Sequence, residues 1–122
     1  MTLDAGPLIQ LDRGHRRVVV LLARANETAR PVIVPGSALA QAIRDPARQA
    51  RLARLLRQPR TQVVPLDRVD ATQVGRLLAA SGTSDIADAH VVICARRSQT
   101  QVVTSDADDL RRLDPTLPLV VL

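Results

Sequence analysis

Short apolar runs alternate along this chain with longer segments in which apolar residues recur at helical spacing. The apolar runs are bounded by proline, aspartate or glycine, and they predict strands around Thr2-Leu3 and at 32–34, 63–64, 101–103 and 119–121. The segments between them predict helices near 7–12, 16–25, 37–44, 46–57, 68–80, 85–97 and 106–113. This alternation is typical of an α/β fold with a mostly parallel sheet of four or five strands. A chain of 122 residues has the length of one domain, so we expect a single domain over residues 1–122.

One predicted helix, residues 46–57, has a basic side. Leucines at helical spacing form its apolar stripe, and arginines recur at every third position on another face. These arginines are Arg48, Arg51, Arg54 and Arg57. This face is either a surface for RNA or a protein partner, or a solvated face that binds nothing specific.

The composition favours a polyanionic partner. All 17 basic residues are arginines, and the formal net charge is +5. A guanidinium group binds phosphate through two hydrogen bonds and stays charged, although a GC-rich coding bias also accounts for the use of arginine in place of lysine. The chain has no Phe, Tyr or Trp, so it cannot stack bases on aromatic side chains. Any contact with RNA would therefore depend on arginine, backbone and metal.

Several other chemistries lack support. His15 and His90 are not at zinc-ligand spacing, the glycines form no phosphate-binding motif, and Ser37 has neither a GxSxG context nor an evident histidine partner. The lone cysteine, Cys94, lies in an apolar run and is expected to be a small buried side chain in a reducing compartment. No apolar stretch approaches the roughly 18 residues that span a bilayer, so we expect a cytoplasmic protein with no membrane partner.

Acidic residues follow the predicted strands or begin the predicted helices at widely separated positions. They are Asp4, then Asp85 and Asp88, then Asp106, Asp108 and Asp109. In an open α/β sheet, residues just past the carboxyl ends of the strands converge on one crevice. Carboxylates held together repel one another by roughly 1 to 4 kcal/mol at 4 Å, and Mg²⁺ and Mn²⁺ prefer oxygen ligands of this kind. Such an ion polarises a phosphate and generates hydroxide from water, so the pattern predicts phosphodiester hydrolysis.

Each aspartate taken singly has another explanation, because acidic residues stabilise the first turn of a helix. Asp85 followed by Asp88 is similar to a capping box, Asp4 could cap the first helix, and Asp106 could cap the last. Caps explain acids at helix starts, but not why strands on the same sheet edge should both end in one.

These residues give the chain a resemblance to the PIN-domain ribonucleases, and within them it is most similar to the VapC-type toxins of bacterial toxin–antitoxin pairs. The resemblance spans essentially the whole chain. It rests on Leu3-Asp4-Ala5-Gly6, Ser37-Ala38-Leu39-Ala40-Gln41, Asp85-Ile86-Ala87-Asp88-Ala89-His90-Val91-Val92 and Val103-Thr104-Ser105-Asp106-Ala107-Asp108-Asp109-Leu110. It implies a PIN-like fold of three layers, α/β/α.

The resemblance also implies roles for individual residues. It assigns metal binding and catalysis to Asp4, Asp88 and Asp106, with Asp109 as a further metal ligand. It places Asp85, Thr104 and Asp108 beside these ligands as supporting groups.

The chain departs from the family at Gln41, where the family usually has a glutamate. Glutamine keeps an oxygen that can bind a metal but removes one negative charge, so metal affinity should fall and a carboxylate base is lost. The resemblance otherwise implies Mg²⁺- or Mn²⁺-dependent cleavage of RNA, a homodimer, and inhibition by a small cognate antitoxin of the VapB kind.

Two alternatives stay open. One is a PIN-like module that no longer cuts but binds RNA or a protein partner. The other is a purely structural subunit in which the acids are helix caps, and this would leave the carboxylates scattered.

Overall fold

The computed structural model describes all 122 residues, and its centre is a sheet of five parallel strands in the order β3-β2-β1-β4-β5. The strands are β1 (Thr2–Leu3), β2 (Val32–Pro35), β3 (Thr61–Val64), β4 (Val102–Thr104) and β5 (Leu119–Val121). Thr2 in the central strand pairs with Ile33 on one side and Val102 on the other. The predicted α/β fold with a mostly parallel sheet of four or five strands is confirmed, and every pairing is parallel.

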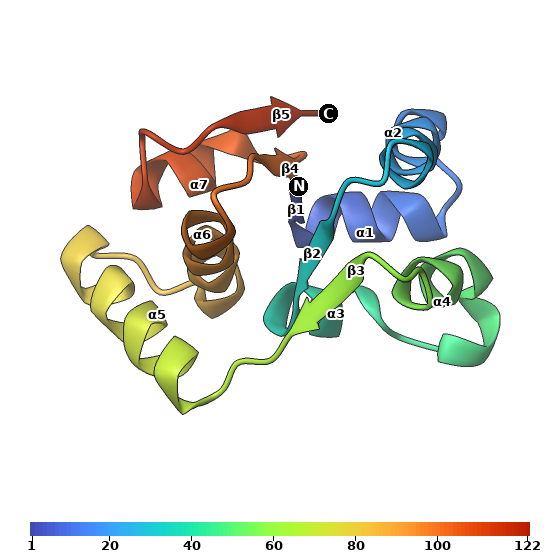
Figure 1. The fold of residues 1–122 in the computed structure, drawn as a ribbon. Coiled ribbons are helices and arrows are strands. Elements are labelled where there is room, and N and C mark those ends of the chain that lie inside the picture. Colours follow the sequence, from blue (N-terminus) through green and yellow to red (C-terminus); the bar gives the residue numbers. More distant parts are fainter.

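Seven α-helices and one 3₁₀ turn connect the strands. They are α1 (Ala5–Asp12), α2 (Arg16–Glu27), α3 (Gly36–Ala42), the turn Pro46–Arg48, α4 (Ala50–Leu56), α5 (Arg68–Ser81), α6 (Ile86–Ser98) and α7 (Ala107–Leu113). Figure 1 shows α1, α2 and α4 on one side of the sheet and α5, α6 and α7 on the other, which gives the three layers of an α/β/α fold. No single helix is long and apolar enough to cross a membrane, and only α5 and α6 together, bent by 110°, have the length and composition to do so.

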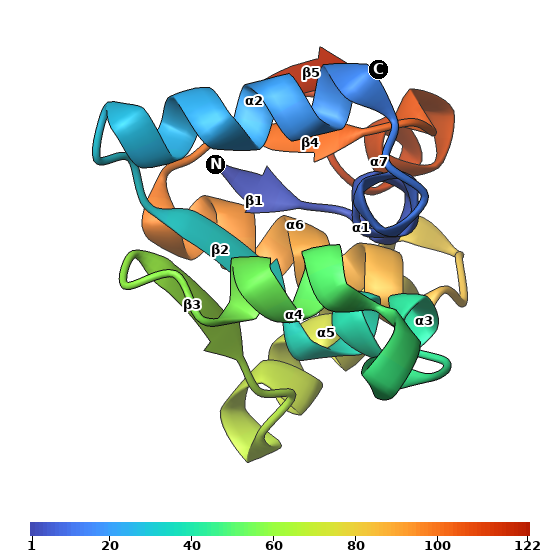
Figure 2. The same ribbon diagram turned by 90° about the vertical axis from the view of Figure 1, so that its right-hand side faces the viewer.

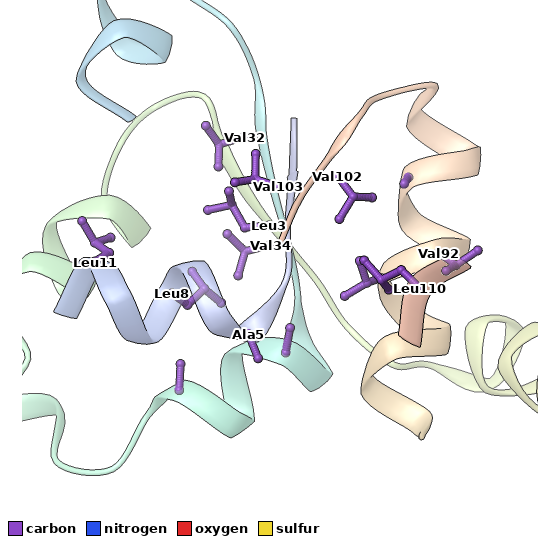
Figure 3. Close-up of a cluster of buried hydrophobic side chains, with 14 of the residues drawn as sticks. Leu3, Ala5, Leu8, Leu11, Val32, Val34, Val92, Val102, Val103 and Leu110 are labelled. Carbon is purple, nitrogen blue, oxygen red and sulfur yellow. The ribbon is translucent and has the colours of Figure 1, made fainter. Parts of the chain in front are cut away.

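The core packs against both faces of the sheet, because side chains alternate from one face of a strand to the other. Figure 3 shows Leu3 and Val103 on the side of α1, near Leu8, and Val102 on the opposite side, near Leu110. All five of these side chains are fully buried. Strands covered on both faces have near-continuous apolar sequences, which is why they stood out as apolar runs.

The single amphipathic helix predicted over residues 46–57 is wrong. A 3₁₀ turn occupies Pro46–Arg48, and α4 begins only at Ala50. Gln49 separates them with a non-helical backbone (φ −107°, ψ 60°). As a result Arg48 lies in the turn and Arg57 follows the last residue of α4, so the four arginines do not share one helical face.

The side chain of Gln49 explains the interruption. Its Oε1 accepts hydrogen bonds from the backbone N–H groups of Arg44 (3.0 Å) and Asp45 (3.2 Å), and its Nε2 donates to the carbonyl of Ala42 (2.9 Å). Nε2 also lies 3.3 Å from a carboxylate oxygen of Asp12 in α1. Gln49 is buried, and these contacts satisfy groups left open where α3 ends.

Candidate active site at the carboxyl edge of the sheet

Asp4 follows the central strand and is held rigidly. Its Oδ1 accepts a hydrogen bond from the backbone N–H of Ala5 at 2.8 Å, so it caps α1 as one interpretation predicted. Its Oδ2 accepts from the Thr104 hydroxyl at 2.8 Å, across 100 residues of sequence. The Thr104 oxygen in turn accepts from the backbone N–H of Asp106 at 2.9 Å. Thr104 therefore joins the carboxyl ends of β1 and β4 and contacts both Asp4 and Asp106.

A close approach of the backbone brings these two strand ends together. A Cβ atom added to Gly6 would lie 2.1 Å from the Ser105 hydroxyl oxygen, which is closer than any packed contact. Glycine at this position lets the first turn of α1 lie against the loop between β4 and α7. The glycine of the Leu3-Asp4-Ala5-Gly6 motif thus has a packing role beside the acids.

The second pair of acids begins α6. Asp85 is the N-cap residue, and its side chain accepts from the backbone N–H of Asp88 at 2.9 Å. Asp88 itself makes no side-chain hydrogen bond to the protein and is partly buried. The capping interpretation therefore holds for Asp85 but leaves the Asp88 carboxylate unexplained.

The third group begins α7. Asp106 occupies the N-cap position but makes no side-chain capping bond, so its carboxylate is not used to start the helix. Asp109 lies beside it, and hydrogen bonding with Asp106 together with the charge of Asp106 raises the pKa of Asp109. Asp108 points away: its side chain is 85% exposed and faces Arg111 at 3.7 Å. The structure thus gathers Asp109 with the other acids and leaves Asp108 outside.

The electrostatics show that acids from three separate segments lie near one another. Burial raises the pKa of Asp88 to about 7, with further increases from the charges of Asp4, Asp85, Asp109 and Asp106. Burial is also the main reason why the pKa of Asp4 is raised, despite its two hydrogen bonds. A scattered set of helix caps would not produce this mutual repulsion, so the carboxylates are gathered at this edge of the sheet.

The gathered groups fit a hard divalent cation. Five carboxylates supply only oxygen donors, the type that Mg²⁺ and Mn²⁺ prefer, and the two raised pKa values show negative charge that the protein itself does not neutralise. Gln41, the remaining predicted site residue, lies on α3 with an exposed side chain that makes no hydrogen bond. Its amide oxygen is available, but it adds no charge.

A second cluster near this edge was not predicted. The Ser37 hydroxyl lies 2.9 Å from Nδ1 of His90, whose Nε2 lies 2.9 Å from Oδ2 of Asp70. Arg97 forms an ion pair with the same carboxylate. The expectation that Ser37 has no histidine partner is therefore wrong, and no local motif could have shown it, because the two residues lie 53 positions apart.

Asp70 and His90 of this cluster pair with each other and with Arg97 and Ser37, and ligating atoms of Asp70, His90 and Cys94 lie within 4.8 Å of one another. Burial raises the pKa of the Cys94 thiol to about 12, so it stays protonated, as expected for a small buried side chain. Asp70 is already paired, since the hydrogen bond from Arg97 lowers its pKa. The cluster is therefore a hydrogen-bonded ion pair.

The basic residues of α4 line a cavity on the opposite side of the sheet from α6. Its volume is about 280 Å³, and Figure 2 shows the three helices α1, α2 and α4 that surround this region. Arg51 and Arg54 line it with two arginines that sequence reasoning missed, Arg30 and Arg60. Arg48 and Arg57 do not line it. The buried hydroxyl of Thr61, which has no hydrogen-bond partner, also lines the cavity.

Comparisons with known proteins agree with this architecture. The family model for the PIN domain matches residues 1–114, whereas no curated protein matches the chain. The crystal structure of VapBC2 from Rickettsia felis, bound to a DNA fragment from their promoter, is similar with a TM-score of 0.69, over 99% of this chain and 97% of that chain. The two sequences are 15% identical, so this likeness concerns the fold alone. The match to the family model over nearly all of the chain shows that the protein belongs to the PIN domain family.

Proposed function

We propose that the protein is a metal-dependent endoribonuclease, the toxin component of a VapC-type toxin–antitoxin pair. The observation that carries this proposal is the gathering of Asp4, Asp88, Asp106 and Asp109 at one sheet edge, where the pKa of Asp88 is about 7. Family membership supports it, because PIN domains are generally metal-dependent nucleases.

The acids at this edge would have different roles in binding the metal ion. Asp4 has one hydrogen bond to each carboxylate oxygen, so it offers a fixed ligand. Asp88 has no such partner, and its carboxylate would exchange a proton for a cation near neutral pH. Asp106 and Asp109 lie next to each other at the start of α7, and the charges of both act on Asp88. A bound Mg²⁺ or Mn²⁺ would polarise the scissile phosphate and lower the pKa of its water.

Cleavage of RNA in the presence of Mg²⁺ or Mn²⁺ tests the proposal. Asp4→Asn, Asp88→Asn and Asp106→Asn should each lower the rate by at least about 100-fold, because removing one charged ligand weakens both metal binding and transition-state stabilisation. Asp108→Asn is the matched control, since Asp108 has the same chemistry but lies outside the cluster. Cleavage that survives in all three site variants would remove the proposed site.

The arginine-lined cavity supports a protein partner. Its floor includes apolar side chains such as Leu22 and Leu55, and its arginines supply positive charge. This combination fits an amphipathic segment with acidic residues, as expected of an antitoxin of the VapB kind, better than it fits RNA. We propose that Arg51 and Arg54 contact this partner, and that the protein forms a homodimer.

The neighbouring gene gives the test of this partnership. A short adjacent reading frame whose product co-purifies with the protein, and loses binding on Arg51→Glu with Arg54→Glu, would support the pair. Arg57→Glu is the control, because Arg57 is exposed and does not line the cavity. If all variants bind the partner equally well, the partner binds outside the arginine-lined cavity.

A second function is favoured by one observation, the absence of a carboxylate at Gln41. In this alternative the protein no longer cuts and instead binds RNA or a protein partner. Calorimetry with Mn²⁺ separates the two functions: no measurable heat at millimolar metal would favour the binding module, whereas saturable binding that Asp88→Asn abolishes would favour the nuclease.

A further inference from the structure

A chain of hydrogen bonds runs from α5 through α6 to α3. Asp70 in α5 contacts Nε2 of His90 in α6, and Nδ1 of His90 contacts the Ser37 hydroxyl in α3, each at 2.9 Å. His90 is fully buried, and Asp70 is 2% exposed. Arg97 pairs with Asp70 from the next turns of α6. We call Asp70, His90 and Ser37 the relay.

Chemistry fixes the direction of the bond between Asp70 and His90. Asp70 is paired with Arg97, and its lowered pKa keeps it ionised, so its oxygens only accept hydrogen bonds. Nε2 of His90 therefore donates a hydrogen bond to Asp70. Nδ1 of the same ring bonds to the Ser37 hydroxyl. Both nitrogens of the buried ring have partners, so the relay defines the position of Ser37 relative to α6.

Both ends of the contact between Ser37 and His90 lie on helices that carry predicted site residues. Ser37 comes two residues after Pro35, the last residue of β2, at the edge where Asp4 follows β1. It also lies one helical turn before Gln41, and residues four apart share a face of a helix. On the other side, His90 comes two residues after Asp88. This is the one side-chain hydrogen bond that joins α3 to α6.

A relay of this kind is costly if its only purpose is stability. Removing a charge and an imidazole from water is unfavourable, and apolar residues of similar volume often stabilise a core as well or better. What polar contacts provide is one defined arrangement, since they fail when the helices shift by a fraction of an ångström. The helices α3 and α6 pack against each other, and several of their buried residues are small and apolar, among them Ala38 and Ala89.

We propose that Asp70, His90 and Ser37 are positioning residues, which hold the Gln41 face of α3 at a fixed separation from Asp88. The proposal rests on the nuclease function proposed above, and it assigns to the relay the placement of α3 against the helix that carries Asp88. None of the three residues touches the substrate in this role. Their effect is on the placement of the groups that do.

A comparison of two buried ion pairs separates positioning from stability. Asp114 is 7% exposed and pairs with Arg96 at 2.9 Å, and it has no bond to α3. Asp70→Asn and Asp114→Asn should therefore both lower the melting temperature. Only Asp70→Asn should also lower kcat for RNA cleavage, by about tenfold as expected for one misplaced hydrogen bond, with KM within twofold. Equal losses of kcat in both variants would overturn the proposal.

Two variants of Ser37 change the relay with less effect on stability, so they test its role even if Asp70→Asn does not fold. Ser37→Ala should lower kcat by about tenfold and weaken Mn²⁺ binding by about threefold, because α3 is no longer fixed. Ser37→Thr keeps the hydroxyl and should stay within twofold of the wild type. Ser98→Ala is the matched control, since the Ser98 hydroxyl bonds only to the far end of α6 and to Thr100. Unchanged kcat and metal affinity in Ser37→Ala would overturn the proposal.

Failure of the nuclease function gives a different result from failure of the relay. A wild type that cleaves while Ser37→Ala cleaves equally well overturns the relay alone. A wild type that binds Mn²⁺ without cleaving RNA overturns the nuclease function, and a weaker affinity in Ser37→Ala but not in Ser98→Ala then still supports the relay. A wild type that neither cleaves nor binds Mn²⁺ overturns both.

Discussion

Asp88→Asn should make the metal-free protein more stable while it removes metal binding. The Asp88 carboxylate is partly buried among other acids, and its pKa rises from 3.8 to about 7. The folded state therefore disfavours the ionised form, and an amide of the same shape carries no charge to repel. Side chains that bind a ligand often destabilise the folded protein when the ligand is absent, and this is the physical basis of the trade-off between stability and function.

The expected gain in the free energy of unfolding follows from the raised pKa of Asp88. A difference of about three pH units corresponds to an upper limit of about 4 kcal/mol, at about 1.4 kcal/mol for each unit. Asp88 is partly open to water, which screens its charge, so we expect about 2 kcal/mol. For a chain of 122 residues this raises the melting temperature by about 5 to 10 °C.

The stability that Asp88→Asn gains over the wild type should increase as the pH rises. Between pH 3.8 and about 7 the folded wild type holds a proton on Asp88 that the unfolded chain releases. The stability of the wild type therefore falls as the pH rises across this window, and it is constant with respect to this group above the window. The advantage of Asp88→Asn should be full at pH 8, about two fifths as large at pH 5, and absent near pH 3.

Thermal unfolding followed by circular dichroism in EDTA measures this effect, with Asp108→Asn as the control. Asp108 is 85% exposed, so its variant should unfold with the wild type at every pH. Adding Mn²⁺ should stabilise the wild type and not Asp88→Asn, since in the proposed site only the folded wild type would bind the ion. An Asp88→Asn protein that is less stable than the wild type at pH 8 in EDTA would refute the argument that the acids repel one another.

Three further predictions concern single side chains. Gly6→Ala should cost about 1 to 3 kcal/mol in urea unfolding, because the new Cβ would lie 2.1 Å from the Ser105 hydroxyl oxygen, and adding Ser105→Gly should restore most of the loss. Gln49→Ala should cost about 1 to 3 kcal/mol by the same measurement, because it leaves two partly buried backbone N–H groups without their acceptor, whereas Gln101→Ala on the surface should cost less than about 0.5 kcal/mol. Gln41→Glu should raise Mn²⁺ affinity in calorimetry and speed RNA cleavage, and the absence of any gain would mean that Gln41 does not face the ion.

The fold could be predicted because its signals are local. Strands covered on both faces are continuous apolar runs, so β2 and β4 stood out without any knowledge of their neighbours. The convergence of Asp4 and Asp106 also followed from a general rule, since both come just past the carboxyl ends of parallel strands.

The features that sequence reasoning missed all depend on contacts between distant residues. The helix predicted over 46–57 had the right period, but Gln49 leaves the helix to bond groups in α3 and a carboxylate in α1. His90 looked like an isolated helix residue, because its partners Asp70 and Ser37 lie 20 and 53 positions away. Periodicity describes which face of an element is apolar, but not which polar side chains meet when the elements pack.

The hydrogen bond between Asp4 and Thr104 bears on when during synthesis the protein becomes active. It spans 100 residues, and the strands that carry its two ends are direct neighbours in the sheet. A growing chain therefore cannot close the acid edge until β4 has left the ribosome, long after Asp4 has done so. For the nuclease proposed above, this means that the acid site would be incomplete during most of the protein's own translation.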